Sequence, residues 1–369
     1  MSRLTVGIDT HRLIGAQGGV GRYLRELLWA WARRPLPFAR VRLYCPRPLP
    51  EGTLPEGHPY DVRVTRGTGP IGVWQHTSLA RAARADSVLF CPSYVAPLTF
   101  RGKFVVTVHD AIHEVMPEAF PRRDRYRALL YRHSARRAAL VVTGSEAARR
   151  DLIHHYGLPA TRVRAIPLGA DALPVGTDDA CVRASLGLAA TPFVLFVGKF
   201  TRRRRLMELV EMTAKLEAAG RPHALVLVGD DPHGFPLAER ARELGIADRV
   251  RILGPLDDHE VAALYRAADV FIYPSEYEGF GLPVVEAMAA GTPVVTLDNT
   301  SLVEIAGGAA VLLPDANPLK MAAAVEDVLD DTTLRADLIA RGRRRARGYT
   351  WSATADATLA ALQDAAEGP

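Results

Sequence analysis

Short apolar runs alternate with amphipathic stretches along the whole chain, and they fall into two successive series. The runs are rich in Val, Ile, Leu and Phe, a composition that favours buried strands. The first series predicts strands over residues 4–8, 41–44, 62–65, 88–90, 104–108 and 140–143. The second series predicts strands over residues 193–197, 225–228, 250–253, 270–273, 294–296 and 311–313.

Helical segments separate many of these runs, and they indicate the fold class. In the first half of the chain, helices are predicted over residues 20–33, 74–84, 122–138 and 146–156. Short apolar strands that alternate with amphipathic helices are typical of parallel sheets covered by helices on both faces. The pattern therefore predicts an α/β protein.

Residues 167–179 separate the two series and are rich in Pro, Gly and Asp, which predicts a linker. We expect two doubly wound, Rossmann-like domains, residues 1–170 and residues 171–350, with a cleft between them. Ligands of such sheets bind beyond the carboxyl ends of the strands. The last helical segment, residues 351–369, is expected to cross back and pack on the first domain.

The composition is that of a folded protein: of 369 residues, 48% are hydrophobic and 24% are charged. No apolar run approaches the ~18 residues that a membrane span needs, and the first residues lack a secretory signal pattern. The three cysteines are scattered along the chain, which fits a reducing cytoplasm. The net charge of +5 favours anionic partners such as a nucleotide, a phospholipid or a nucleic acid.

The segment 275–286 contains the most informative set of polar residues. Gly279 and Gly281 remove Cβ atoms that would keep a ligand off the backbone. Pro283 is placed where the first turn of a helix tolerates proline, and such a helix start attracts phosphate. Glu278 precedes the turn, and Glu286 is expected in the first turn of the helix. Because both acids would repel a phosphate, they are better suited to accept hydrogen bonds from sugar and ribose hydroxyls.

Four arginines, residues 202–205, follow the strand 193–197 and Gly198. Arginine forks hold a diphosphate through paired hydrogen bonds and neutralise the charge of a leaving nucleotide. A solvated charge run is the alternative. Since the cluster follows a strand end, we expect two of the four side chains to face a ligand.

Two features of the first domain carry weaker signals. Gly18 and Gly19 precede a helix, where glycines let a ligand approach the backbone, although a plain turn explains them equally well alone. His109 follows the strand 104–108, and a single histidine in such a place is more often structural than catalytic.

No pair of aspartates spaced for a divalent metal and no zinc-ligand cluster is found in the sequence, which favours a metal-independent reaction. Residues 122–137 form a basic, partly amphipathic segment. It is suited equally to an anionic membrane surface and to solvent.

Taken together, these residues resemble the retaining glycosyltransferases of the GT-B fold, specifically glycosyltransferase family 4. The most specific part is residues 268–295, which look like the Glu-x7-Glu signature of that family. The resemblance implies that Glu278 contacts the donor sugar and Glu286 the ribose. It also implies that the amides of Gly279, Phe280, Gly281 and Leu282 serve the phosphates or the sugar.

The arginine–lysine pair of the family aligns with Arg203 and Arg204, so a planar fork replaces a compact ammonium here. The resemblance further assigns Gly18 and Gly19 to an N-terminal glycine loop and places His109 near the reacting sugar. The implied donor is a nucleoside diphosphate sugar, GDP-mannose or a UDP-hexose, which acts as co-substrate without a further cofactor.

These inferences predict metal-independent, retaining transfer of a hexosyl unit to a hydroxyl of a glycan or lipid-linked glycan. A secondary metabolite or small sugar is the second acceptor class. A sugar-nucleotide 2-epimerase or a phosphorylase is the nearest rival among enzymes. A nucleic-acid-binding protein is disfavoured, because the arginine clusters lack interleaved aromatic residues.

Overall fold

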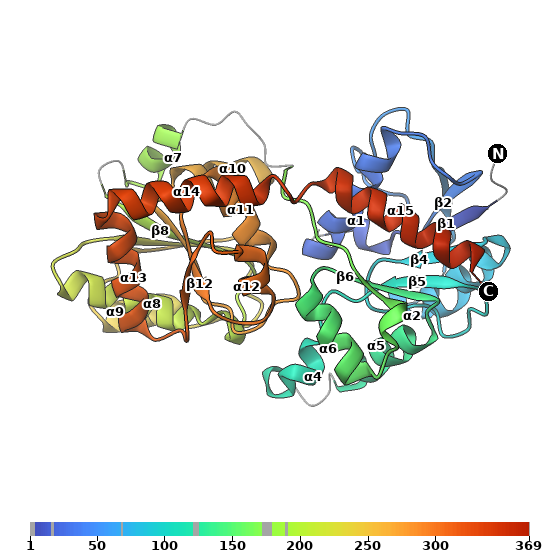
Figure 1. Ribbon diagram of the computed structural model, residues 1–369, viewed down its shortest axis with the longest axis horizontal. Coiled ribbons are helices and arrows are strands. Elements are labelled where there is room, and N and C mark those ends of the chain that lie inside the picture. Colours follow the sequence, from blue (N-terminus) through green and yellow to red (C-terminus); the bar gives the residue numbers. More distant parts are fainter. Residues whose placement is uncertain are drawn as a thin grey trace. The chain divides into compact units, whose positions relative to one another are not determined.

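A computed structural model describes residues 4–15, 18–67, 69–120, 125–171, 179–188 and 191–368. The chain divides into two compact units. Unit 1 contains Met1–Gly169 and Trp351–Pro369, and unit 2 contains Ala170–Thr350. Figure 1 follows the chain through both units. Of the predicted linker, residues 172–178 lie outside the described residues.

Unit 1 contains a parallel sheet of seven strands in the order β3-β2-β1-β4-β5-β6-β7. The strands are β1 (Thr5–Asp9), β2 (Arg40–Cys45), β3 (Asp61–Val64), β4 (Val88–Cys91), β5 (Phe104–Thr107), β6 (Leu140–Thr143) and β7 (Val163–Ala165). The first six agree closely with the predicted runs. The short edge strand β7 was not predicted, because only Val163 of its three residues is buried and no apolar run marks it.

The helices of unit 1 are α1 (Gly19–Ala32), α2 (Ile71–Trp74), α3 (Ala80–Ala82), α4 (Ile112–Val115), α5 (Arg125–Arg137), α6 (Glu146–Tyr156) and α15 (Trp351–Glu367). The helix predicted over 74–84 is divided, since a π-helical turn, Gln75–Leu79, lies between α2 and α3. Residues 122–124 of the predicted basic helix lie outside the described residues.

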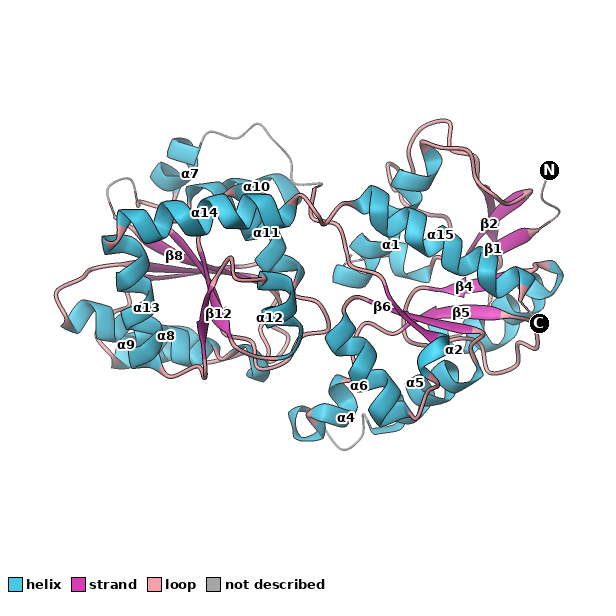
Figure 2. Cartoon of the chain, viewed as in Figure 1, coloured by secondary structure: helices cyan, strands magenta, loops and turns pink. Residues whose placement is uncertain are grey.

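Unit 2 contains a parallel sheet of six strands in the order β10-β9-β8-β11-β12-β13. The strands are β8 (Phe193–Val197), β9 (Ala224–Val228), β10 (Val250–Leu253), β11 (Val270–Tyr273), β12 (Val294–Leu297) and β13 (Val311–Leu313), all at predicted positions. The helices are α7 (Asp179–Ser185), α8 (Leu206–Ala218), α9 (Leu237–Glu243), α10 (Asp258–Ala267), α11 (Leu282–Ala290), α12 (Thr300–Ala306), α13 (Pro318–Asp330) and α14 (Thr332–Ala346). Figure 2 shows how helices flank each sheet.

Buried apolar side chains on both faces of the first sheet form the core of unit 1. On one face, α1 and α15 pack together, and Trp31 Nε1 donates a hydrogen bond to the carbonyl of Ala355 at 2.9 Å. Trp351, Leu359 and Leu362 of α15 are buried in this core. The last helix thus belongs to the core of unit 1, although the whole of unit 2 precedes it in the sequence.

Both sheets reverse their strand order at an equivalent place. In unit 1 the chain runs outward through β1, β2 and β3 and then returns to β4 on the other side of β1. In unit 2 it runs through β8, β9 and β10 and returns to β11 beside β8. Such switch points are where α/β sheets bind ligands, at the carboxyl ends of the strands. The loops after β1 and β4, and those after β8 and β11, are therefore the places where the fold favours a site.

Candidate active site

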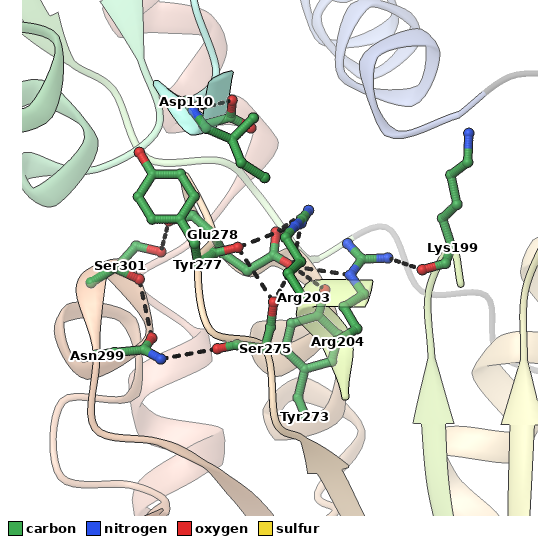
Figure 3. A network of polar contacts seen from close by, with 12 residues as sticks. Asp110, Lys199, Arg203, Arg204, Tyr273, Ser275, Tyr277, Glu278, Asn299 and Ser301 are labelled. Atoms are coloured by element: carbon green, nitrogen blue, oxygen red, sulfur yellow. Dashed lines mark hydrogen bonds and ion pairs between the residues drawn. The ribbon is translucent and has the colours of Figure 1, made fainter. Parts of the chain in front are cut away.

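The loops after β8 and β11 bring two arginines and one glutamate together. Arg203 Nη2 lies 3.2 Å from Glu278 Oε2, and Arg204 Nε lies 3.1 Å from Glu278 Oε1. The three side chains are only 10–14% exposed. Figure 3 shows this arginine–glutamate cluster at close range. Paired, largely desolvated charges of this kind are held in a fixed geometry.

Neighbouring hydroxyl groups fix the carboxylate of Glu278. Tyr273 Oη and Ser275 Oγ donate hydrogen bonds to Glu278 Oε1 at 2.8 and 2.9 Å. The Tyr273 ring stacks on Phe196 and Phe271, with ring centres 5.6 and 5.9 Å away. Aromatic side chains of β8 and β11 thus hold in place the tyrosine that orients the carboxylate of Glu278.

A second layer fixes the backbone around Glu278 (Figure 3). Ser301 Oγ donates to the carbonyl of Glu278 at 2.7 Å, and Asn299 Nδ2 donates to the carbonyl of Ser275 at 3.1 Å. These residues, like Tyr273 and Ser275, were not predicted as site residues. A hydroxyl or amide near the end of a strand is too common in sequences to mark a site by itself.

The charges of the cluster shift its acid–base equilibria. Burial alone raises the pKa of Glu278, but the positive charges of Arg203 and Arg204 and hydrogen bonds from Tyr273 and Arg204 outweigh it, lowering the pKa to about 2. Burial lowers the pKa of Arg204, yet the charge of Glu278 raises it overall. The cluster is therefore fully ionised at neutral pH and carries one net positive charge.

The four consecutive arginines have different surroundings. Arg203 and Arg204 contact Glu278, whereas Arg205 pairs with Glu208 at 2.9 Å and also with Glu276. Arg202 is exposed. Arg205 has a left-handed backbone, with φ of 50°, that turns the chain into α8. This turn directs Arg205 to acids other than Glu278.

Gly198 makes room for the cluster. Its φ is 149°, and a Cβ atom at this position would lie 2.7 Å from Arg204 Nη1. The Arg204 Nη1 group donates to the carbonyl of Lys199 at 2.8 Å, which holds the guanidinium over the strand end. Any side chain at position 198 would displace the guanidinium group of Arg204.

The start of α11 lies next to the cluster in sequence and is built by glycine. Gly281 is the N-cap, with φ of 100°, and a Cβ there would lie 2.8 Å from Leu302 Cδ2. Leu282 and Pro283 open the helix, and the Phe280 ring packs edge-on against Tyr349 at 5.6 Å. The Phe280 side chain is thus used for packing, which leaves the backbone amides of this segment as the groups suited to a ligand.

The prediction that Glu286 lies in the first turn of the helix was wrong. Because α11 begins at Leu282, Glu286 is its fifth residue, in the second turn. The residue is 3% exposed, and Tyr265 Oη donates to Glu286 Oε2 at 3.1 Å. The helix begins one residue before Pro283, and the Glu-x7-Glu spacing by itself does not show this.

In unit 1, Gly18 caps the start of α1 and Gly19 is its first residue. A Cβ atom at either glycine would meet no atom within 4 Å from the described residues beyond its chain neighbours, so packing against that part of the chain does not require a glycine there. Residues 16 and 17 of the same glycine-rich loop lie outside the described residues.

His109 follows β5, and its ring lies between two tyrosines. The ring centres of Tyr23 and Tyr94 are 5.2 and 5.5 Å away, and His109 Nε2 lies 3.2 Å from the carbonyl of Pro92. Since a carbonyl only accepts, Nε2 carries the proton in this contact. Burial lowers the pKa of His109, although the charge of Asp110 partly offsets this. The ring is therefore best suited to act as a neutral, oriented group.

Neither a membrane span nor a metal cluster is found among the residues that the structure describes. None of the helices there is both long enough and apolar enough to span a bilayer. No group of three or more His, Cys, Asp or Glu side chains there is arranged to hold a metal ion.

Two family models together match most of the chain. The model described as "Glycosyltransferase Family 4" matches residues 17–172, and the model described as "Glycosyl transferases group 1" matches residues 182–345. The chain is also 30% identical over 287 residues to O-antigen chain mannosyltransferase B of Escherichia coli, covering 75% of this chain and 74% of that enzyme. The chain belongs to glycosyltransferase family 4 (group 1). The second model includes both Arg203 and Glu278.

Another relative and one solved structure are also similar to the chain. D-inositol 3-phosphate glycosyltransferase of Kineococcus radiotolerans is 37% identical over 241 residues, covering 59% of this chain and about half (55%) of that enzyme. The crystal structure of Anabaena HepE in complex with UDP-glucose matches with a TM-score of 0.79 at 20% identity, covering 98% of this chain and all of that one. This similarity shows that the chain has the GT-B fold.

Proposed function

We propose that this family 4 protein transfers a hexosyl unit from a nucleoside diphosphate sugar to a hydroxyl, with retention of the anomeric configuration and without a metal ion. The observation that carries the proposal is the arginine–glutamate cluster at the β8/β11 switch point. In this proposal unit 2 binds the donor and unit 1 binds the acceptor.

The arginines are assigned to the donor diphosphate. With Glu278 paired to Arg203 and Arg204, the cluster retains one positive charge, which attracts an anionic diphosphate. As the bond from the sugar C1 to the diphosphate oxygen breaks, negative charge grows on the leaving group. The two guanidinium groups stabilise that charge because they are already oriented by Glu278, so little reorganisation is needed.

The acids are assigned to hydroxyl groups of the donor. Glu278 accepts hydrogen bonds in its ionised state at neutral pH, as its low pKa supports, and would accept one from the donor sugar. Glu286 is assigned to the ribose, and the amides at Gly279, Phe280, Gly281 and Leu282 to the phosphates or the sugar.

On the acceptor side, His109 positions the reacting sugar and the acceptor, while Gly18 and Gly19 let a substrate approach the start of α1. The acceptor oxygen bonds to C1 on the face that the diphosphate leaves, and its proton passes to a departing phosphate oxygen. This same-face route retains the anomeric configuration.

The names of relatives support two choices of substrate. A mannosyltransferase for O-antigen chains supports GDP-mannose and a glycan or lipid-linked glycan, whereas a D-inositol 3-phosphate glycosyltransferase supports a small acceptor that carries a phosphate. A HepE structure that contains UDP-glucose supports a UDP-hexose as the donor.

The proposal is tested by assaying GDP-mannose and UDP-glucose with an octyl mannoside and with D-inositol 3-phosphate as acceptors. Glu278→Gln and Arg203→Ala are expected to lower transfer by at least about a hundredfold without unfolding the protein. Arg202→Ala, which removes the exposed neighbour of the pair, is the matched control and should retain activity. Near-wild-type rates in both site variants would remove the assignment.

Two further readouts of the same assay test the finer claims. Addition of a chelator should leave the rate unchanged, and a strict need for manganese would contradict the metal-independent route. NMR of the product should show the anomeric configuration of the donor. Conversion of the sugar nucleotide without any acceptor would favour the epimerase instead.

Peripheral contact with an anionic membrane is a second part of the proposal. On α5, Tyr126 and Leu129 are 54% and 67% exposed in a helix rich in arginine, which suits a lipid surface. Co-sedimentation with phosphatidylglycerol vesicles should be lost in Leu129→Asp, and unchanged binding would place α5 in solvent.

A further inference from the structure

The β1/β4 switch point of unit 1 contains polar side chains that have no role in the reaction proposed above. Asp9 is the last residue of β1, and a short 3-10 turn, His11–Leu13, follows it. On the adjacent strand, Ser93 follows β4, and Arg12 Nε donates to Ser93 Oγ at 2.9 Å. The two loops are thus tied together at the place equivalent to the arginine–glutamate cluster of unit 2.

A buried carboxylate orients the His11 ring. Asp9 Oδ1 lies 2.7 Å from His11 Nδ1, and Asp9 Oδ2 accepts from Gln75 Nε2 at 2.8 Å. The side chains of Asp9 and His11 are 2% and 10% exposed. Since an ionised carboxylate only accepts, Nδ1 carries the hydrogen, and in the neutral ring Nε2 is left as an acceptor.

We propose that His11 binds the hydroxyl of the acceptor through Nε2, and that Asp9 acts as a positioning residue that fixes the ring. This inference rests on the proposed function and deepens it, since it names a residue of unit 1 that recognises the nucleophile. The ligand class is an alcohol, such as a sugar or polyol hydroxyl, which donates to a neutral imidazole nitrogen.

Local backbone features near the Asp9–His11 dyad support a functional role. Gln75 begins the π-helical turn Gln75–Leu79, and such turns are frequent at functional sites. Tyr94, after β4, has a left-handed φ of 55°, a strained state for a residue other than glycine. The other such residues among those described are Arg205, which precedes α8 beside the donor-side cluster, and Thr300, which is the first residue of α12 and the neighbour of Ser301.

His11 and His109 have different assignments because their ring nitrogens have different partners. His109 Nε2 is committed to the carbonyl of Pro92, whereas His11 uses Nδ1 for Asp9. The His109 ring is also enclosed by Tyr23 and Tyr94. The acceptor hydroxyl is therefore assigned to His11, and the role of His109 in positioning the sugar is unchanged.

A purely structural role for the dyad makes a different prediction. Asp9 Oδ1 also accepts from the backbone N–H of His11 at 3.1 Å, so the carboxylate stabilises the turn after β1. If stability were the only role of His11, the bond from Nδ1 to Asp9 would be the important one. If His11 binds the acceptor, the group at the Nε2 position would matter more than the bond to Asp9.

The variants His11→Asn and His11→Gln separate the two roles. Asparagine places an amide N–H near Nδ1 and leaves nothing at Nε2, whereas glutamine reaches the Nε2 position and gives up the bond to Asp9. We expect His11→Asn to lower kcat/KM for the octyl mannoside or D-inositol 3-phosphate by about tenfold. His11→Gln should retain more of this activity, and KM for the donor should stay within about twofold in both.

Hydrolysis of GDP-mannose or UDP-glucose without acceptor is measured alongside, and His11→Asn should leave it within about twofold. His154→Asn, an exposed histidine on α6, is the matched control and should behave as wild type. An unchanged acceptor KM and kcat in His11→Asn, or a larger loss in His11→Gln, would overturn the assignment of His11 alone. Wild-type protein that hydrolyses or transfers neither donor would overturn the proposed function and this inference with it.

Discussion

At the scale of single residues, Glu278 is the most heavily engaged polar group of the candidate site. Its carboxylate accepts hydrogen bonds from Arg203, Arg204, Tyr273 and Ser275. A carboxylate with this many donors stays ionised far below its ordinary pKa. The acid therefore has two tasks: it holds two arginines in place, and in the proposed reaction it contacts the donor sugar.

The low pKa of Glu278 predicts a pH-dependent contribution to stability. Because the pKa is about 2 in the folded protein and 4.5 ordinarily, the contribution is fully present above pH ~4.5 and is lost as the pH falls toward 2. It amounts to about 3 kcal/mol at most. Urea unfolding of wild type and Glu278→Gln between pH 3 and 7 should show curves that converge in acid, and a constant difference would contradict the assigned pKa.

Tyr273→Phe tests the support of Glu278 without removing a charge. The ring stacking with Phe196 and Phe271 is kept, and one hydrogen bond to Glu278 is lost. We expect a loss of about 1 kcal/mol in the free energy of unfolding and a severalfold fall in kcat. Transfer at the wild-type rate would mean that Arg203, Arg204 and Ser275 suffice to orient the acid.

At the scale of elements, short loops at the carboxyl ends of the strands position the site. The turn Arg202–Arg204 leads into α8, and Gly281 leads into α11. Each of these helices is preceded by a residue with left-handed backbone, Arg205 before α8 and Gly281 before α11. These conformations set the direction of the loop side chains and of the backbone amides at the start of α11. The candidate site therefore depends on backbone geometry as well as on residue identity.

Gly281→Ala tests this dependence. With φ of 100° and Leu302 Cδ2 only 2.8 Å from a new Cβ, alanine should reduce the free energy of unfolding by about 1–3 kcal/mol. Gly18→Ala, at φ of −76° and with no described atom close to a new Cβ, should cost less, about 0.5–1 kcal/mol, because alanine is a poorer N-cap than glycine. Equal losses in urea unfolding of the two variants would contradict the argument.

At the scale of the whole molecule, the chain leaves unit 1 at Gly169 and returns to it at Trp351. The returning helix α15 buries Trp351, Leu359 and Leu362 against the core of unit 1. The stability of unit 1 thus depends on residues made after unit 2, so unit 1 is complete only when the whole chain is present.

Trp351→Ala should therefore destabilise unit 1 by about 3–5 kcal/mol and leave unit 2 nearly unchanged. Hydrogen exchange should show faster exchange in β1 and α1 but the same protection in β8 and β9. Leu319→Ala, at a side chain of unit 2 that is 63% exposed, is the control and should change neither unit. Equal loss of protection in both units would contradict the assignment of α15 to unit 1.

Local residue patterns are enough to predict the α/β class, most strand positions and the residue types of the candidate site. Most of the strands that the structure describes are short, largely apolar runs, so twelve of them are visible without coordinates, whereas β7, at the sheet edge, is not. The signature around Glu278 and the arginines after Gly198 are local patterns of the same kind.

Which of these residues come into contact depends on the tertiary structure. Arg203 and Glu278 are 75 positions apart, and two strands side by side bring them together. The same packing diverts Arg205 to Glu276 and buries Glu286 against Tyr265. It also joins Asp9, His11 and Gln75, which no sequence motif connects. Contacts of this kind depend on strand order and loop conformation, and local residue patterns do not encode either one directly.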